Sequence, residues 1–296
     1  MANTVFVAAV CAYLVYKVSI LGWYEVLSSL PTSPWFYILF VIRFLSLPLF
    51  EIVIYRRFWD FSALHSIPVF LRKRVYNHGL MDYSGEAYFY LWAQKNARDP
   101  ETRIFSIIKD VNIVSAVVSV VATVILLLML AKSNSLYQLD QHFPSANVYL
   151  WTFAGVGAVA ISLLIIFRRR VMFFSAADTT AVSLLHIARL ALVLALQALQ
   201  WWVAIPSVPL VDWLFFLALY MVVGRLPFVP NKDLAFLAVA VGLAGAVSNQ
   251  ETAVSAMFLA NLALYQLVNV SVYLATSFQE HTTLIGKAAK RQSRQA

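Results

Sequence analysis

Two ionisable residues lie inside an apolar stretch of the chain, where a charged side chain is costly. Arg43 is near the middle of residues 34–55, and Glu51 follows it by eight positions, with Pro48 between them. Eight residues at about 100° each return to nearly the same face of a helix. An ionisable group near the centre of a bilayer costs at least about 2.5 kcal/mol, so such residues usually face a partner or a water-filled cavity. We therefore expect Arg43 and Glu51 either to border one polar groove or to pair with other helices.

Two more pairs of ionisable residues have spacings that could support chemistry. Asp82 and Glu86 are four residues apart, next to the aromatic run AYFYLW. Such carboxylates could bind a cation or exchange a proton, and they could equally be helix N-terminal charges favoured by the dipole. Lys109 and Asp110 open another apolar stretch. Because adjacent residues do not face each other on a helix, we expect these two to contact different neighbours, as interfacial anchors or as part of a polar site.

A run of three basic residues supplies the chemistry to bind an anion. Arg72, Lys73 and Arg74 are consecutive, and arginine can bind phosphate oxygens through two parallel hydrogen bonds. We expect them, together with Arg43, to hold a phosphate or another anionic headgroup.

Uncharged amides in apolar stretches are expected to form hydrogen bonds between helices. These amides are Gln197, Gln200, Asn261, Gln266 and Asn269.

Composition indicates that membrane helices position these residues. The chain has 296 residues, of which 61% are hydrophobic and 12% are charged, whereas about a quarter of the residues of a soluble domain are charged. The net charge of +8 comes from basic residues between apolar stretches. This pattern favours orientation in a membrane and contact with anionic lipid over nucleic-acid binding.

Motifs of common enzymes are missing from the sequence. It contains no HExxH, GxSxG, P-loop or CxxC pattern, each of which marks a known catalytic or metal-binding arrangement. The single cysteine, Cys11, excludes an intramolecular disulfide and a cysteine-rich metal site. We therefore expect no catalytic residues, no metal and no cofactor.

Eight apolar stretches approach the length of about 20 residues that crosses a bilayer. Proline-containing breaks at residues 28–34, 206–209 and 227–233 predict helix ends, because proline cannot donate the helical hydrogen bond. The sequence therefore predicts an all-α polytopic membrane bundle of about eight spanning helices. We assign residues 1–280 to this single domain and 281–296 to a basic tail. The candidate spans are 5–22, 34–55, 104–131, 148–167, 181–205, 208–224, 233–249 and 254–278.

The positions of Lys and Arg predict how these spans are oriented. Short cytoplasmic loops carry an excess of both residues. Four basic clusters fall on one side if both termini are cytoplasmic, whereas the opposite loops contain only Lys132. We therefore expect an integral membrane protein with both termini in the cytoplasm. The clusters are Arg56 with Arg57, Arg168 to Arg170, Arg225 with Lys232, and the tail residues Lys287, Lys290, Arg291 and Arg294.

Residues 60–103 do not fit a simple span, because they leave the cytoplasmic side and return to it. Two short apolar stretches, 64–71 and 87–93, are separated by the polar segment RKRVYNHGLMDYSGE. A re-entrant hairpin fits this pattern, and so does an amphipathic hairpin on the membrane surface. Irregular backbone at membrane depth must be surrounded by protein or line a water-filled cavity. If the hairpin enters the bilayer, we expect it to line such a cavity.

Several segments follow one another in a characteristic order. GWYEVLSSLP precedes an apolar stretch that ends in EIVIYRRFW, and Asn77 is followed eight and nine residues later by Gly85 and Glu86. IFSIIKDVNIV then places a basic-acidic pair at the start of a long apolar stretch, and RLPFVPNKD places paired prolines before another. This order resembles the transmembrane, flippase-like module of the lysylphosphatidylglycerol synthase family.

The resemblance implies a protein that binds phospholipids or lipid-linked sugars and moves them between the leaflets of a bacterial cytoplasmic membrane. It also implies that residues 60–103 are a re-entrant hairpin in a central cavity, where Asn77 and Glu86 shape the hairpin and contact the headgroup. No segment corresponds to the soluble aminoacyl-transferase domain of some family members, so we do not expect this chain to aminoacylate lipids.

Departures from the family pattern keep other classes open. Met81 and Tyr83 stand where the family has Pro and Arg, and a Pro-Asn-Lys turn at 230–232 replaces Pro-Gly-Gly. These changes agree with a non-catalytic structural subunit that binds a membrane-protein partner or a second copy of itself. A small-solute transporter would need a site at broken helices, for which Pro48 and the break at 227–233 are candidates. A lipid transporter should have a polar cavity of headgroup size, whereas a structural subunit should have paired and packed charges.

Overall fold

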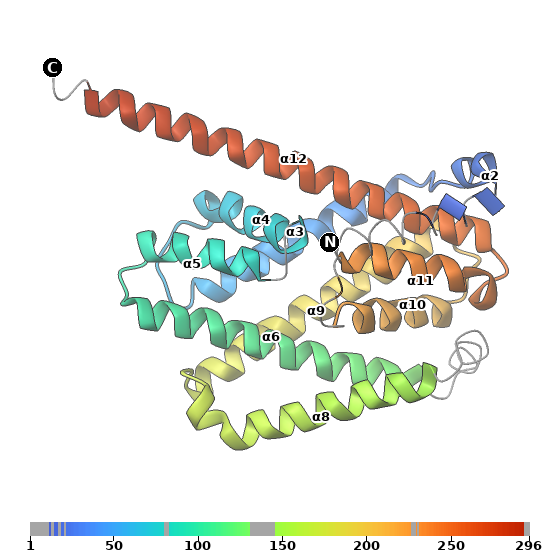
Figure 1. Ribbon diagram of the computed structural model, residues 1–296, viewed down its shortest axis with the longest axis horizontal. Coiled ribbons are helices and arrows are strands. Elements are labelled where there is room, and N and C mark those ends of the chain that lie inside the picture. Colours follow the sequence, from blue (N-terminus) through green and yellow to red (C-terminus); the bar gives the residue numbers. More distant parts are fainter. Residues whose placement is uncertain are drawn as a thin grey trace.

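The computed structural model describes residues 22–79, 83–130, 146–225 and 231–292, with a few single positions outside these ranges. Every regular element within them is an α-helix (Figure 1), as the sequence predicts. The helices are α2 (Trp23–Ser28), α3 (Pro34–Tyr55), α4 (Ala63–Gly79), α5 (Ser84–Asn96), α6 (Glu101–Leu130), α8 (Ala146–Val171), α9 (Ala176–Ala204), α10 (Leu210–Val223), α11 (Lys232–Val247) and α12 (Glu251–Gln292).

Four of the described helices are long and apolar enough to cross a membrane, consistent with an integral membrane protein. They are α3, α9, α6 as far as Met129 and α12 as far as Ser277. The predicted spans 208–224 and 233–249 form α10 and α11, whose 14 and 16 residues fall short of a full crossing of about 20 residues. In α8 the apolar part is Ala154–Leu164, and the predicted span 5–22 lies mostly outside the described residues. Four of the eight spans are thus supported, and four remain predictions.

Helices begin and end where the prolines predict. Pro34 is the first residue of α3, a position that suits proline because a first helical residue needs no N–H donor. Pro209 directly precedes α10. Asn231 precedes α11 with a φ of 53°, and its Oδ1 accepts a hydrogen bond of 3.1 Å from the Leu234 N–H. Asparagine tolerates this left-handed conformation better than most residues. Asn231 therefore adopts a conformation typical of glycine and also caps the helix.

Two hydrophobic cores hold the helices together. One joins α9, α10, α11 and α12 around Trp201, Trp213 and Phe258, whose ring centroids lie 5.2 to 6.5 Å apart. The other joins the second half of α3 with α4, α5 and α6 around Tyr55 and Phe89. The helix α9 packs along α3 and contributes to both cores. In Figure 1, α12 runs along one edge of the molecule and α8 lies at the opposite edge, against α6.

The helices α4 and α5 pack side by side as a helical hairpin (Figure 1), the general form expected for residues 60–103. The polar linker between the two helices is much shorter than predicted, because α4 continues through the basic run to Gly79. The hairpin contacts α3 and α12 through α4, and α6 through α5, so it is part of the bundle. Its depth in a bilayer remains a prediction. At the other end of the chain, α12 continues to Gln292 and includes most of the predicted tail.

Candidate functional site

Lys73, on α4, is a buried cation between two carboxylates from other helices. Its side chain is 2% exposed, and Nζ lies 2.8 Å from Oε1 of Glu51 on α3 and 3.6 Å from Oε1 of Glu86 on α5. The rings of Tyr55 and Phe89 flank the ammonium group at 5.3 and 5.4 Å. We refer to Glu51, Lys73 and Glu86 as the Lys73 cluster. Three helices thus meet at one group of charges.

The neighbours of Lys73 favour its charged form. Burial by itself lowers the pKa of the Lys73 ammonium group, but Glu51, Tyr55 and Glu86 together raise it by more, so the net pKa lies above the ordinary lysine value. The cluster has two carboxylates for one ammonium group. Oε2 of Glu86 and the hydroxyl of Tyr55 are buried without a hydrogen-bond partner among the described residues. The cluster therefore has unused capacity to bind hydrogen-bond donors.

A close contact between α4 and α5 explains the spacing of Asn77, Gly85 and Glu86. The Gly85 N–H donates a hydrogen bond of 2.7 Å to Oδ1 of Asn77. A Cβ atom at position 85 would overlap the carbonyl oxygen of Lys73 and lie 2.7 Å from Oδ1 of Asn77. Only glycine allows this approach, and the next residue, Glu86, then faces Lys73. The structure thus brings five predicted site residues together: Glu51, Lys73, Asn77, Gly85 and Glu86.

The three consecutive basic residues do not form one phosphate site. Successive residues of a helix point about 100° apart, and their side chains contact different helices. Arg72 extends to Ser277 on α12, at 3.4 Å. Arg74 donates hydrogen bonds of 2.9 Å to the carbonyl oxygen of Phe44 on α3 and to the hydroxyl of Tyr265 on α12. Of these three basic residues, only Lys73 contacts Glu51 and Glu86. The expected phosphate site is therefore not assembled in this conformation.

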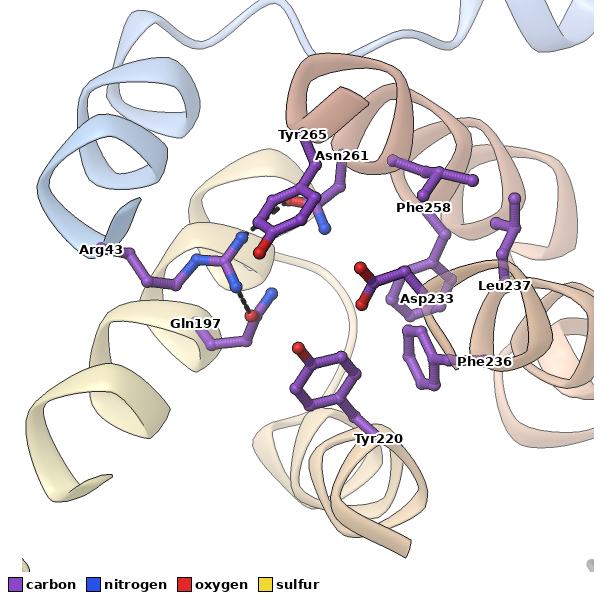
Figure 2. Close-up of a pocket in the computed structure, with 10 residues that line it drawn as sticks. Arg43, Gln197, Tyr220, Asp233, Phe236, Leu237, Phe258, Asn261 and Tyr265 are labelled. Atoms are coloured by element: carbon purple, nitrogen blue, oxygen red, sulfur yellow. Dashed lines mark hydrogen bonds between the residues drawn. The ribbon is translucent and has the colours of Figure 1, made fainter. Parts of the chain in front are cut away.

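Arg43 and Glu51 pair with different helices, which is the second of the two arrangements expected for them. Arg43 is 6% exposed and donates hydrogen bonds to Oε1 of Gln197 on α9 and, over 3.3 Å, to Oδ1 of Asn261 on α12 (Figure 2). Gln200 also donates to Asn261, over 3.1 Å. The predicted hydrogen bonds between helices are confirmed for these three amides. The other two, Gln266 and Asn269, make none within the described ranges.

A small cavity lies beside Arg43, and Asp233 of α11 faces it (Figure 2). The cavity also borders Tyr220 and Tyr265, and its volume is about 30 Å³, which is enough for about one or two waters and too small for a lipid headgroup. Asp233 was missed at the sequence level, because an acidic residue in the first turn of a helix already has an ordinary role. α3 is continuous through Pro48, so this helix is not broken beside the cavity, whereas Asp233 lies in the first turn of α11, at the end of the predicted break at 227–233.

Lys109 and Asp110 lie apart from the Lys73 cluster and hold the linker between α8 and α9. Oδ2 of the fully buried Asp110 accepts hydrogen bonds of 2.6 and 2.8 Å from the N–H groups of Phe173 and Phe174. Nζ of Lys109 donates to the Val171 carbonyl over 2.5 Å and lies 3.3 Å from Oδ1 of Asp110. The two side chains contact different residues, as expected, although these residues lie within one short stretch of chain: Val171 ends α8, and Phe173 and Phe174 belong to the linker.

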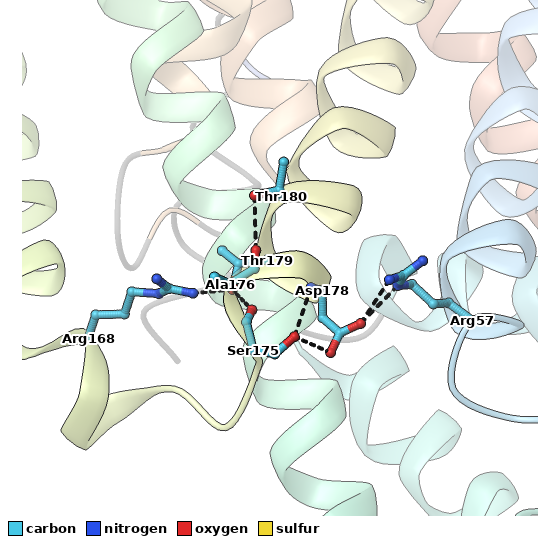
Figure 3. A network of polar contacts seen from close by, with 7 residues as sticks. All are labelled: Arg57, Arg168, Ser175, Ala176, Asp178, Thr179 and Thr180. Atoms are coloured by element: carbon cyan, nitrogen blue, oxygen red, sulfur yellow. Dashed lines mark hydrogen bonds and ion pairs between the residues drawn. The ribbon is translucent and has the colours of Figure 1, made fainter.

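Two of the basic clusters that predict orientation meet at the start of α9. Arg57 pairs with Asp178 at 3.0 Å, and the Asp178 N–H donates to Oγ of Ser175, which caps the helix (Figure 3). Arg168 donates a hydrogen bond of 2.9 Å to Oγ1 of Thr179. These contacts tie the ends of α3 and α8 to α9. Asp82, the last of the predicted site residues, lies outside the described ranges.

Comparison with known proteins adds no relative to this picture. No protein-family model, curated protein or solved structure matches the chain. The fold and the site therefore define the class: a helical protein with four helices able to cross a membrane and with buried charges between its helices. Within the described residues, no three His, Cys, Asp or Glu side chains come together as a metal site.

Proposed function

We propose that this chain is a flippase-like membrane protein, related to the transmembrane module of the lysylphosphatidylglycerol synthase family, that binds a lipid headgroup at the Lys73 cluster. The observation that carries the proposal is the buried Lys73, held with two partly buried carboxylates between a membrane helix and a helical hairpin. Ionisable residues among membrane helices are costly to bury and are by default candidates for a functional site.

The geometry of the cluster favours a headgroup that carries both a phosphate and hydrogen-bond donors. Glu51 is the tighter partner of Lys73, at 2.8 Å, and Glu86 is the looser one, at 3.6 Å. A phosphate that displaces Glu86 would take its place beside the Lys73 ammonium group. The released Glu86 carboxylate would then accept hydrogen bonds from an amine or a sugar hydroxyl of the same headgroup. Phosphatidylethanolamine and lipid-linked sugars have both groups.

Translocation requires a second conformation, because Glu51, Glu86 and the rings of Tyr55 and Phe89 surround the Lys73 ammonium group in the described one. The hairpin of α4 and α5 is the element that we expect to move, since it supplies Lys73 and Glu86 whereas Glu51 is on α3. The hydrogen bond between Asn77 and Gly85 would keep α4 and α5 together as one moving unit. In this proposal the hairpin is re-entrant, all eight predicted spans cross the bilayer, and both termini are cytoplasmic.

Reconstitution into vesicles tests the proposal. Purified protein in vesicles that contain fluorescent phosphatidylethanolamine should expose lipid of the inner leaflet to a membrane-impermeant quencher. Glu86→Gln and Lys73→Met should abolish this exposure, whereas Arg57→Gln, which removes a pair at the start of α9, should retain it. Equal translocation by all four proteins would show that the Lys73 cluster is not the site. Absence of translocation by the wild type with every headgroup tried would reject the function.

A structural subunit of a membrane complex is the second candidate, and one observation favours it. The Lys73 ammonium group is paired and buried, and the cavity beside Arg43, at about 30 Å³, is too small for a lipid headgroup. A buried ion pair can usually be replaced by uncharged residues as a group without loss of stability. If the protein is a subunit, the triple variant Glu51→Gln, Lys73→Met, Glu86→Gln should still co-purify with its partner. If the protein is a flippase, this variant should be folded and inactive.

A further inference from the structure

An apolar groove lies in the wedge between the end of α3 and the start of α4. Its volume is about 300 Å³, far larger than that of the cavity beside Arg43. Six of its seven lining residues are apolar, and the seventh is an arginine. The lining residues are Leu49, Ile52, Val53, Arg56, Ala63, Leu64 and Ile67.

The groove continues along an exposed apolar face of α3. Ile38, Ile42, Leu45, Leu49 and Val53 are all exposed, and their spacing of three or four residues places them on one side of the helix. From Ile38 to Val53 the helix rises by about 22 Å. Half of the hydrocarbon core of a bilayer is about 15 Å thick. This face is therefore long enough to contact one acyl chain over the full thickness of a leaflet.

Arg56 supplies a positive charge at the end of this face. It follows α3 directly and is exposed, and among the described residues it has no acidic partner, whereas the adjacent Arg57 pairs with Asp178. A free guanidinium group can bind a lipid phosphate through two hydrogen bonds. Positive charge at the membrane surface also attracts anionic lipid.

We propose that the wedge between α3 and α4 binds one acyl chain of an anionic phospholipid, with the lipid phosphate held by Arg56. The site is separate from the Lys73 cluster, because Glu51 and Tyr55 project from α3 toward Lys73 and the groove residues lie on another face of the helix. The bound lipid would fill the space where α3 connects to α4 and would hold the hairpin in place against α3. The proposal depends on the membrane location of α3 and goes beyond translocation, since it concerns a resident lipid.

Native mass spectrometry of delipidated protein, titrated with palmitoyl-oleoyl phosphatidylglycerol or phosphatidylcholine, tests the site. We expect the wild type to retain one phosphatidylglycerol and to prefer it over phosphatidylcholine. Arg56→Gln should weaken phosphatidylglycerol binding by about tenfold, because a charge-assisted hydrogen bond to phosphate is lost. Leu64→Trp should fill the groove and weaken both lipids, and Leu64 is 77% exposed, so this variant should fold.

Two control variants separate this site from general effects. Arg57→Gln removes an adjacent positive charge that is already paired, and Val41→Phe enlarges an exposed side chain of α3 that does not line the groove. Both should bind phosphatidylglycerol as the wild type does. The proposal is overturned if Arg57→Gln weakens binding as much as Arg56→Gln, if Leu64→Trp binds normally, or if a co-purified protein occupies the groove. Because the readout is binding, a wild type that fails to translocate lipid does not affect the result.

Discussion

The N–H of Gly85 donates a hydrogen bond of 2.7 Å to Oδ1 of Asn77, and this contact holds the first turn of α5 against α4. The contact occurs one residue before Glu86, so it also sets where that carboxylate meets Lys73. The backbone contact at Gly85 therefore helps to place Glu86 beside the buried Lys73.

Gly85→Ala should destabilise the protein by about 1–3 kcal/mol, the usual cost of overpacking. The added methyl group would overlap the carbonyl oxygen of Lys73, which is backbone and cannot rotate away. Thermal unfolding in detergent measures the effect. Gly155→Ala is the matched control, because a Cβ atom there meets nothing within 4 Å. Alanine in place of a helical glycine should leave stability equal or raise it, and an equal loss at both positions would contradict the packing argument.

Asn77→Ala should lower stability by about 1–3 kcal/mol, because the Gly85 N–H would lose its acceptor. Hydrogen exchange of the first turn of α5 should accelerate as well, since this turn would separate from α4. Asn96→Ala is the control: its side chain donates only to the Trp92 carbonyl within the same helix and is exposed. If both variants lose the same stability, the contact with Gly85 has no special role.

Lys73→Met should be among the most damaging single substitutions, with a loss of about 3–5 kcal/mol, because it leaves two carboxylates without a cation. Adding Glu51→Gln and Glu86→Gln should restore most of the stability, since no unpaired charge then remains. Unfolding of the single and triple variants in the same detergent measures both effects. A triple variant that is no more stable than Lys73→Met would show that the loss comes from packing and not from charge.

Asp110→Ala should lower stability and loosen the linker between α8 and α9. Two backbone N–H groups, those of Phe173 and Phe174, would lose their acceptor, at about 1–3 kcal/mol for each buried donor. Limited proteolysis should then cut near residue 173 faster than in the wild type. Lys109→Met changes the adjacent residue, whose side chain is 35% exposed, and should have a much smaller effect on both measurements.

Cysteine labelling can distinguish a protein with eight membrane-spanning helices from one with four. In a Cys11→Ser background, Asp60→Cys and Asn249→Cys place one exposed thiol each before α6 and after α11. Eight spans, with a hairpin that returns to its own side, predict that an impermeant reagent reaches these two thiols from opposite sides of the membrane. If only α3, α6, α9 and α12 cross, two crossings separate the positions and both thiols should be labelled from the same side.

Local chemistry determined much of the fold in advance. Pro34, Pro209 and the break before Lys232 mark helix boundaries, because proline restricts its own backbone and that of the residue before it. Long apolar runs predicted α3, α6, α9 and α12 as helices long and apolar enough to cross a membrane, since length and hydropathy are properties of the segment itself. The spacing of Asn77, Gly85 and Glu86, which the family resemblance singled out, corresponds to the contact between α4 and α5 that places Glu86 beside Lys73.

Tertiary structure alone decided which charges meet. Arg72, Lys73 and Arg74 look equivalent in sequence, yet they point to different helices because each residue turns by about 100° around α4. Their partners are distant in the chain: Glu51 is 22 residues from Lys73, and Tyr265 is 191 residues from Arg74. The sequence by itself therefore determined that costly charges lie among apolar helices. The packing of α3 against α4, α5 and α9 decided how those charges are paired, because a buried charge is stable only where another helix brings its partner within hydrogen-bond distance.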